Sequence, residues 1–122
     1  MSTFKRFEDI EAWKTARELS TMAYTVSKVK AFQYDYSLRD QMRRSAVSVM
    51  SNIAEGFESR TKNGFIQYLG IAKASSGEFR SQLYVVLDQK YVNQNDFETL
   101  FNLTEKCSCQ ISKLITYLKT NV

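Results

Sequence analysis

Polar side chains form a line along one predicted helix, where they could build either a functional site or a network of hydrogen bonds between helices. At about 100° per residue, they share one stripe beside the apolar face: Gln41, Arg44, Ser48, Asn52 and Glu55. If the next helix runs antiparallel, a second polar stripe faces the first: Tyr68, Ser75, Glu78 and Gln82. The chemistry open to such residues is acid–base catalysis by two glutamates or structural hydrogen bonding.

The positions of Glu55 and Glu78 disfavour catalysis. On antiparallel helices they lie near opposite ends of the stripe, farther apart than the roughly 5–9.5 Å that paired carboxylates span in glycoside chemistry. A structural network fits better, with an Arg44–Glu78 ion pair within it. Further neighbours are expected to be Gln41 with Gln82, Asn52 with Tyr68, and Ser48 with Ala72. We therefore predict that the protein is not an enzyme.

The sequence contains no histidine, so it lacks the commonest general base and metal ligand. Its two cysteines, Cys107 and Cys109, point about 200° apart on a helix, so they can neither share a metal ion nor form a disulfide with each other. Cys107 fits an apolar face and is expected to be buried. We predict no metal and no cofactor. Free thiols and a start without the apolar run of a secretory signal indicate a cytoplasmic setting.

Hydrophobic periodicity predicts four amphipathic helices, over about residues 8–29, 37–57, 62–89 and 95–119. Ser37 and Asn95 are the expected N-caps of the second and fourth helices. The sequence has no proline and four glycines, which disfavours turn-rich β folds. We expect a single domain over residues 1–122: an all-α, antiparallel up-down-up-down four-helix bundle. No apolar stretch approaches the ~20 residues of a membrane span, so no membrane association is expected.

Apolar residues also lie outside the expected core, which indicates a contact between copies of the chain. They form extra faces on the second and third helices: Val47, Met50 and Ala54, and Ile66, Gly70, Gly77 and Tyr84. A glycine inside a helix costs about 1 kcal/mol relative to alanine, and such a cost is typical of places where another backbone comes close. The alternative is a slightly apolar surface, which is common. We favour a homo-oligomer.

Basic side chains recur along the chain, whose formal net charge is +4. The candidate phosphate contacts are Arg39, Arg43, Arg60, Lys62 and Lys73. In one chain, interleaved acids favour a solvated mixed-charge face, but an oligomer would repeat every basic patch. Phe32, Tyr34 and Tyr36 alternate in the first loop and could stack on unpaired bases. A loop folded over the end of the bundle is the commoner arrangement for such a segment.

Several segments together resemble one known family. They are Phe7-Glu8-Asp9-Ile10 followed by Trp13 and Ala16, the run 38–46, and above all Ser51-Asn52-Ile53-Ala54-Glu55-Gly56. Over about residues 4–119 the chain resembles the four-helix-bundle family encoded in intervening sequences of bacterial 23S rRNA genes. The resemblance implies a small cytoplasmic bacterial protein that assembles as a ring, commonly a pentamer. A similar fold is implied for accessory variability determinant proteins of diversity-generating retroelements, which bind nucleic acid and reverse transcriptase.

The residues and the resemblance together lead to one predicted function and one alternative. The prediction is a non-enzymatic oligomeric bundle that binds structured RNA or a ribonucleoprotein through repeated basic patches. The alternative is a protein–protein adaptor or scaffold, for example for a reverse transcriptase or another RNA enzyme, without direct RNA contact. A hydrolase would need a solvent-accessible cleft that joins Glu55 with Asn52 and Tyr68. No small-molecule substrate is expected.

Overall fold

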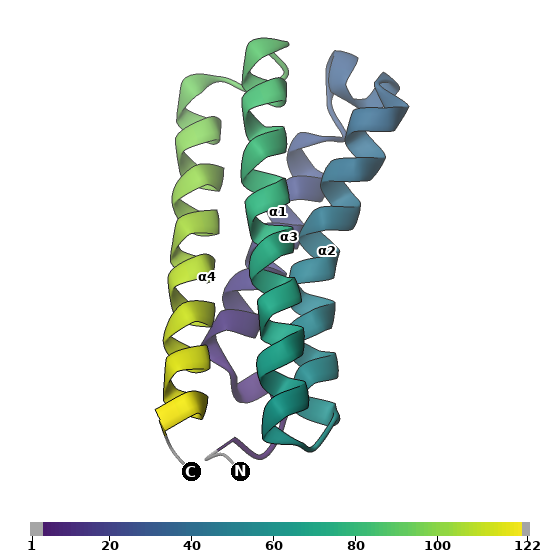
Figure 1. The fold of residues 1–122 in the computed structure, drawn as a ribbon. Helices are drawn as coiled ribbons and strands as arrows, with labels where there is room; N and C mark the ends of the chain where they lie inside the picture. The colour runs from purple at the N-terminus through teal and green to yellow at the C-terminus, as the bar shows by residue number, and fades with distance from the viewer. Residues whose placement is uncertain (1–3, 121–122) are drawn as a thin grey trace.

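Four long helices make up the protein, of which a computed structural model describes residues 4–120, apart from the side chain of Lys30. The elements are η1 (Phe7–Asp9), α1 (Glu11–Val26), η2 (Lys30–Tyr34), α2 (Tyr36–Glu58), α3 (Lys62–Asp88) and α4 (Gln94–Thr120). No strand occurs among the described residues, so the predicted all-α class is confirmed. In Figure 1 the helices lie side by side, with the α2–α3 connection at one end and η2 and the α3–α4 connection at the other.

Two clusters of buried apolar side chains fill the space between the helices. The cluster nearer the α2–α3 connection includes Ile53, Phe57, Phe65, Leu69 and Ile111. The cluster in the other half includes Leu19, Met42, Phe79, Leu83 and Leu100. The apolar period predicted for the third helix is confirmed, because each of its positions is buried: Phe65, Leu69, Ala72, Ser76, Phe79, Leu83 and Val86. Within residues 4–120, no helix is long and apolar enough to cross a membrane.

The first helix is shorter than the predicted range of residues 8–29. Ile10 has an extended backbone (φ −78°, ψ 122°), so η1 is a separate turn and α1 begins only at Glu11. At the other end, the hydroxyl of Ser27 donates a hydrogen bond to the Ala23 carbonyl oxygen over 2.7 Å, just after the helix ends at Val26. Such local side-chain bonds compete with helix continuation. The predicted boundaries of this helix are therefore wrong by three residues at each end.

Both predicted N-caps also lie two residues too late. Asp35, rather than Ser37, caps α2, because its Oδ1 accepts a hydrogen bond from the backbone N–H three residues on, at 3.3 Å. Asn93, rather than Asn95, makes the equivalent bond at the start of α4, at 2.7 Å. Asp, Asn and Ser are about equally good caps. Where two of them flank a helix start, residue type alone does not decide which one is used.

The helices α2 and α3 come close together beside Gly56. A Cβ atom at Gly56 would lie 2.8 Å from Cβ of Tyr68 and 3.0 Å from the ring of Phe65, so any side chain there would force the helices apart. The segment Asn52-Ile53-Ala54-Glu55-Gly56 thus ends on a glycine with a packing role. Gly70 and Gly77 differ, because a Cβ atom at either would have no neighbour within 4 Å.

Candidate nucleic-acid interface

The polar stripes of α2 and α3 meet in a partly buried seam of hydrogen bonds. The hydroxyls of Ser48 and Ser75 share a hydrogen bond of 2.9 Å. Asn52 supports Ser48 from the next turn, because its Nδ2 donates to the Ser48 carbonyl oxygen at 2.8 Å and to its hydroxyl at 3.0 Å. Deeper in the seam, Ser45 donates to Oε1 of Gln82 at 2.7 Å. The seam is a network of hydrogen bonds between the two helices, in which two predicted pairs do not form. The expected proximity of Asn52 to Tyr68 and of Ser48 to Ala72 stays a prediction.

The predicted Arg44–Glu78 ion pair does not form, and both side chains are exposed. Glu78 instead accepts a weak hydrogen bond of 3.5 Å from Gln82 of its own helix. A long charged side chain beside a seam reaches water easily, which avoids the cost of desolvating the pair. The predicted Gln41–Gln82 pair is also wrong, since Gln41 is exposed and donates to Ser37 at 2.9 Å.

The other members of the predicted network lie at its margin. Tyr68 is half-buried, and its Cβ faces the backbone of Gly56. Glu55 is exposed.

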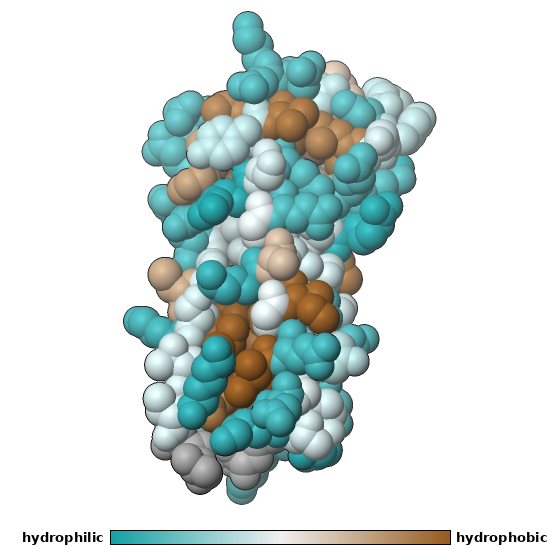
Figure 2. All heavy atoms as spheres, viewed as in Figure 1, coloured by the Kyte–Doolittle hydropathy of each residue, from teal (hydrophilic) through white to brown (hydrophobic). Residues whose placement is uncertain are grey.

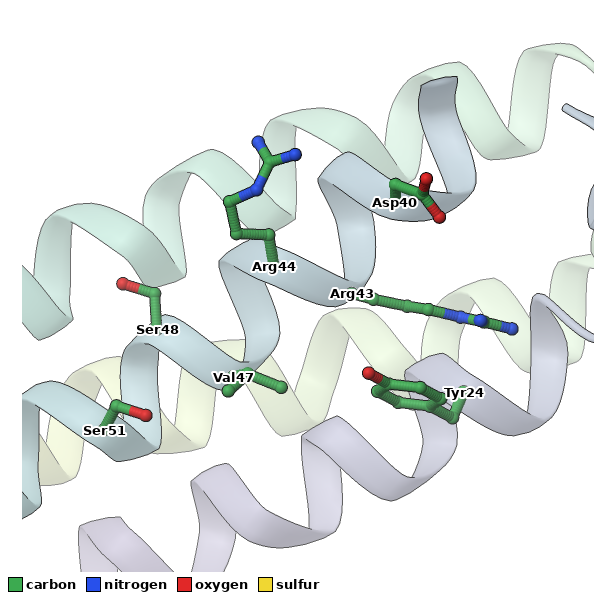
Figure 3. Close-up of a pocket in the computed structure, with 7 residues that line it drawn as sticks. All are labelled: Tyr24, Asp40, Arg43, Arg44, Val47, Ser48 and Ser51. Carbon is green, nitrogen blue, oxygen red and sulfur yellow. The ribbon is translucent and has the colours of Figure 1, made fainter. Parts of the chain in front are cut away.

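Three adjoining hollows run along the outer surface between α1 and α2, and we call them together the α1/α2 groove. The first has a volume of about 490 Å³ and is shown in Figure 3; it is lined by Tyr24, Asp40, Arg43, Arg44, Val47, Ser48 and Ser51. The second, about 410 Å³, includes Arg17, Tyr24, Lys28 and Met50. The third, about 210 Å³, is lined by Phe7, Trp13, Met50, Ser51 and Ala54. Shared lining residues make the groove continuous.

Arg43 is held in place within the groove by two contacts from α1 and its C-cap. Its Nε donates to the buried hydroxyl of Ser27 at 2.8 Å. Its guanidinium lies over the ring of Tyr24, 4.5 Å from the ring centroid. In Figure 3 the Arg43 side chain runs along this ring while Arg44 points away from both. Since neither contact involves a carboxylate, Arg43 keeps its full positive charge available to a ligand.

The half of the groove around Tyr24 is strongly positive. Four cations line the first and second hollows: Arg17, Lys28, Arg43 and Arg44. Asp40 is the one carboxylate among the lining residues of these two hollows, and it already accepts a hydrogen bond of 2.9 Å from Nε of Arg39. The third hollow, by contrast, has no charged lining residue, and four of its five lining residues are apolar. The groove thus has a basic half and an apolar half.

The five predicted phosphate contacts do not form a single patch. Arg43 lines the groove, but Arg39 beside it is largely engaged: it binds Asp40, and its Nη1 donates to the carbonyl oxygen of Gln33 at 3.0 Å. Arg60 and Lys62 lie at the α2–α3 connection, at the opposite end of α2. Arg60 has a left-handed backbone (φ 64°) and pairs with Glu58 at 3.5 Å. Lys73 lines a separate small hollow between α3 and α4.

Sequence reasoning missed three residues of the basic half as a site: Arg17, Tyr24 and Lys28. Arg17 and Tyr24 lie seven residues apart on α1 and so share one stripe of its outer face, and Lys28 follows four residues later, just beyond the end of the helix. That stripe is the signal that could have identified them. Arg44 was assigned to an ion pair instead, although it lines the same hollow as Arg43.

The residues predicted to contact another copy fall on two different faces. Val47, Met50 and Ala54 line the α1/α2 groove. Gly77 lies in the hollow between α3 and α4, and Tyr84 packs against two rings of α4, with centroid distances of 5.5 and 6.2 Å. Ile66 is half-buried against the core, and Gly70 is exposed. Figure 2 shows apolar side chains on the face formed by α3 and α4, gathered towards the two ends of the bundle.

The two cysteines have opposite environments. Cys107 is fully buried, and burial raises the pKa of its thiol to about 12. Cys109 is exposed on the same helix, and both thiols are free. The expectation of a buried Cys107 is confirmed. Among the described residues, no group of three or more Cys, Asp or Glu side chains is placed to hold a metal ion.

Comparisons with known proteins agree with the fold. The model of a family described as 23S rRNA-intervening sequence protein matches residues 8–113. The chain is also similar to a crystal structure of a protein with unknown function from the S23 ribosomal protein family of Bacteroides thetaiotaomicron VPI-5482. That similarity covers 86% of this chain and 95% of the other, with a TM-score of 0.79 and 19% sequence identity. No curated protein matches the chain. At this identity, the structural likeness bears on the fold alone.

Proposed function

The chain belongs to the 23S rRNA-intervening sequence protein family, and on that premise we propose that it is a non-enzymatic cytoplasmic protein that assembles as a ring and binds structured RNA. The observation that carries this proposal is the basic half of the α1/α2 groove. Its four cations face one carboxylate, which is already bound by Arg39. Such an excess of fixed positive charge attracts the phosphates of nucleic acid and releases their counterions.

Arg43 is the best-positioned phosphate contact in this proposal. Because Ser27 and Tyr24 hold its side chain, little rotamer entropy remains to be lost on binding. An arginine can present two parallel donors to one phosphate. Arg44 and Lys28 are exposed beside it and add charge at the surface without such constraint.

Assembly as a ring is supported by the two faces that carry the residues predicted to meet another copy. A closed ring is built from head-to-tail contacts, in which each copy uses two different surfaces. The apolar half of the α1/α2 groove can receive the α3/α4 face of the next copy, which carries Gly70, Gly77 and Tyr84. The basic half would then remain open and be repeated in every copy. A pentamer is the subunit number that the family resemblance implies.

Binding to structured ribosomal RNA fragments across a salt series tests the proposed function. We expect the logarithm of affinity to fall linearly with the logarithm of salt concentration. In the double variant Arg43→Gln/Arg44→Gln, the affinity at low salt should fall and the slope should become shallower by about one for each phosphate that the protein no longer neutralises. The matched control is Lys106→Gln/Lys113→Gln, which removes the same charge from exposed positions of α4.

Two outcomes would contradict this proposal. If the control weakens binding as much as the groove variant, net charge rather than the groove drives the interaction. If the wild-type protein binds no RNA even at low salt, the adaptor function is favoured instead. A salt-insensitive complex with a protein partner would then support the adaptor.

The proposed assembly is tested by light scattering on Ala54→Glu. Ala54 is half-buried in the apolar half of the groove. If copies of the chain meet here, a carboxylate at this position would be buried in their contact without a partner, which is costly. We therefore expect the wild type to be an oligomer and the variant to be a monomer that keeps its helicity. Ala54→Ser, which adds no charge, is expected to leave the oligomer intact. A wild-type protein that is monomeric at micromolar concentration would rule out the ring.

A further inference from the structure

The segment that joins α1 to α2 closes one end of the bundle and is anchored there by a buried ring. We call residues 29–36 the strap; they include the first residue of α2. Phe32, in η2, is 1% exposed and stacks on Tyr91, with ring centroids 4.9 Å apart and planes inclined by 11°. The Tyr91 hydroxyl donates to Asp35 at 3.0 Å, and this hydrogen bond raises the pKa of Tyr91. The second carboxylate oxygen of Asp35 caps α2. The strap is therefore tied to both α2 and the start of the α3–α4 connection.

Two tyrosines of the strap point into solvent despite this anchoring. Tyr34 is 66% exposed and Tyr36 is 60% exposed, the highest values among the large apolar side chains of the described chain. The expected folding of the loop over the bundle end thus holds for Phe32 but not for Tyr34 and Tyr36. Exposed aromatic rings on a segment held by hydrogen bonds lose little conformational entropy when they bind a flat ligand.

Positive charge accompanies Tyr36 and connects the strap to the groove. The guanidinium of Arg39 lies 4.9 Å from the ring centroid of Tyr36, and Arg39 also binds the strap through the carbonyl oxygen of Gln33. Arg39 and Arg43 lie one helical turn apart on α2, so the Tyr36–Arg39 pair adjoins the Tyr24–Arg43 pair. The two carboxylates nearby, Asp35 and Asp40, already accept hydrogen bonds.

We propose that Tyr34 and Tyr36 stack on unpaired bases, so that the RNA bound by this protein carries a single-stranded segment next to the phosphates in the basic half of the groove. This inference rests on the proposed RNA-binding function and names the class of RNA. Every base offers a flat face to an aromatic ring. In an A-form duplex those faces are covered by neighbouring base pairs, so a duplex offers the strap only its backbone and minor groove.

The test compares a single-stranded RNA oligonucleotide with the long duplex that it forms with its complement. Three proteins are measured: the wild type, Tyr34→Leu/Tyr36→Leu and Tyr34→Phe/Tyr36→Phe. Leucine keeps an apolar side chain without a ring, whereas phenylalanine keeps the ring. We expect the leucine variant to bind the single strand about ten-fold more weakly or worse, which is the loss of one or more stacked bases. The phenylalanine variant and duplex binding should be unchanged.

A fluorescent base analogue in the single strand reports stacking directly. Its emission should be quenched by the wild type and the phenylalanine variant, and not by the leucine variant. Unchanged affinity and quenching in the leucine variant would overturn the inference. So would equal losses in both variants, because the hydroxyls rather than the rings would then make the contact.

The failures of this inference and of the proposed function are distinguishable. If Arg43→Gln/Arg44→Gln weakens RNA binding while the leucine variant does not, the function stands and the base-stacking role is wrong. If the wild type binds neither RNA at low salt, both are wrong. A leucine variant with an altered oligomer mass would instead identify the strap as a contact between copies of the chain.

Discussion

Replacing Phe32 by alanine is expected to lower the free energy of unfolding by about 3–5 kcal/mol, the range for removing a fully buried phenylalanine. The ring is 1% exposed and belongs to the core cluster in the half of the bundle that contains η2. Its removal leaves a cavity and also ends the stack on Tyr91. Thermal unfolding followed by circular dichroism should show a midpoint lower by roughly 10 °C or more.

The matched control for Phe32→Ala is Tyr34→Ala, two residues along the same strap. Because Tyr34 is mostly exposed, its truncation should change stability by no more than about 0.5 kcal/mol. The two variants separate anchoring from ligand contact: Phe32→Ala affects the fold, and Tyr34→Ala affects single-strand binding. Equal stability of Phe32→Ala and the wild type would mean that the strap does not depend on this anchor.

The strap also illustrates what could be predicted from its sequence. The alternation of Phe32, Tyr34 and Tyr36 indicates an aromatic loop but does not tell which ring is buried. That choice depends on Tyr91, which comes from the α3–α4 connection and stacks on Phe32. Its position relative to the loop is fixed only when all four helices have packed.

The helices themselves were predictable because their apolar residues repeat with the helical period over long stretches. The α3 positions from Phe65 to Val86 that follow this period are all buried. Helix ends were less predictable, since they depend on single residues such as Ile10 and Asp35. Starting the helix one or two residues earlier or later changes the free energy little.

The partners within the polar seam could not be predicted from the stripes alone. A stripe gives the direction of a side chain around the helix, but not the axial register of the facing helix to within one residue. Ser45, on the margin of the apolar face, is the residue that meets Gln82. Charged Arg44 extends into solvent instead. The partners of Arg43 could not be predicted from the stripes either, because Ser27 and Tyr24 lie 16 and 19 positions before it in the chain.

Three of the glycines provide a second prediction, in which alanine destabilises the protein at one site and stabilises it at the other two. Gly56→Ala is expected to destabilise the protein by about 1–3 kcal/mol, the usual cost of forcing an extra methyl group into a packed contact. The new Cβ would lie 2.8 Å from Cβ of Tyr68, an atom close to the backbone that cannot turn away. The helices α2 and α3 would have to separate, which would also strain the Ser48–Ser75 bond further along the seam.

Gly70→Ala and Gly77→Ala are the matched controls, with the same chemical change in the middle of one helix. Neither new methyl group would meet an atom of a neighbouring helix. Alanine favours the helix by up to about 1 kcal/mol over glycine. We therefore expect both variants to raise the unfolding midpoint of the isolated chain, while Gly56→Ala lowers it. A drop in stability in all three would mean that helix packing around Gly56 is not the cause.

The same two controls probe the interface between copies. If the α3/α4 face of one copy enters the groove of the next, the missing side chains at Gly70 and Gly77 allow the two backbones to approach closely. Added methyl groups would then weaken the assembly even as they stabilise each helix. On dilution, light scattering should show the variant oligomers dissociating at a higher protein concentration than the wild-type oligomer. Stability and assembly would move in opposite directions. If the variants are more stable and equally oligomeric, the two glycines lie outside the proposed interface between copies.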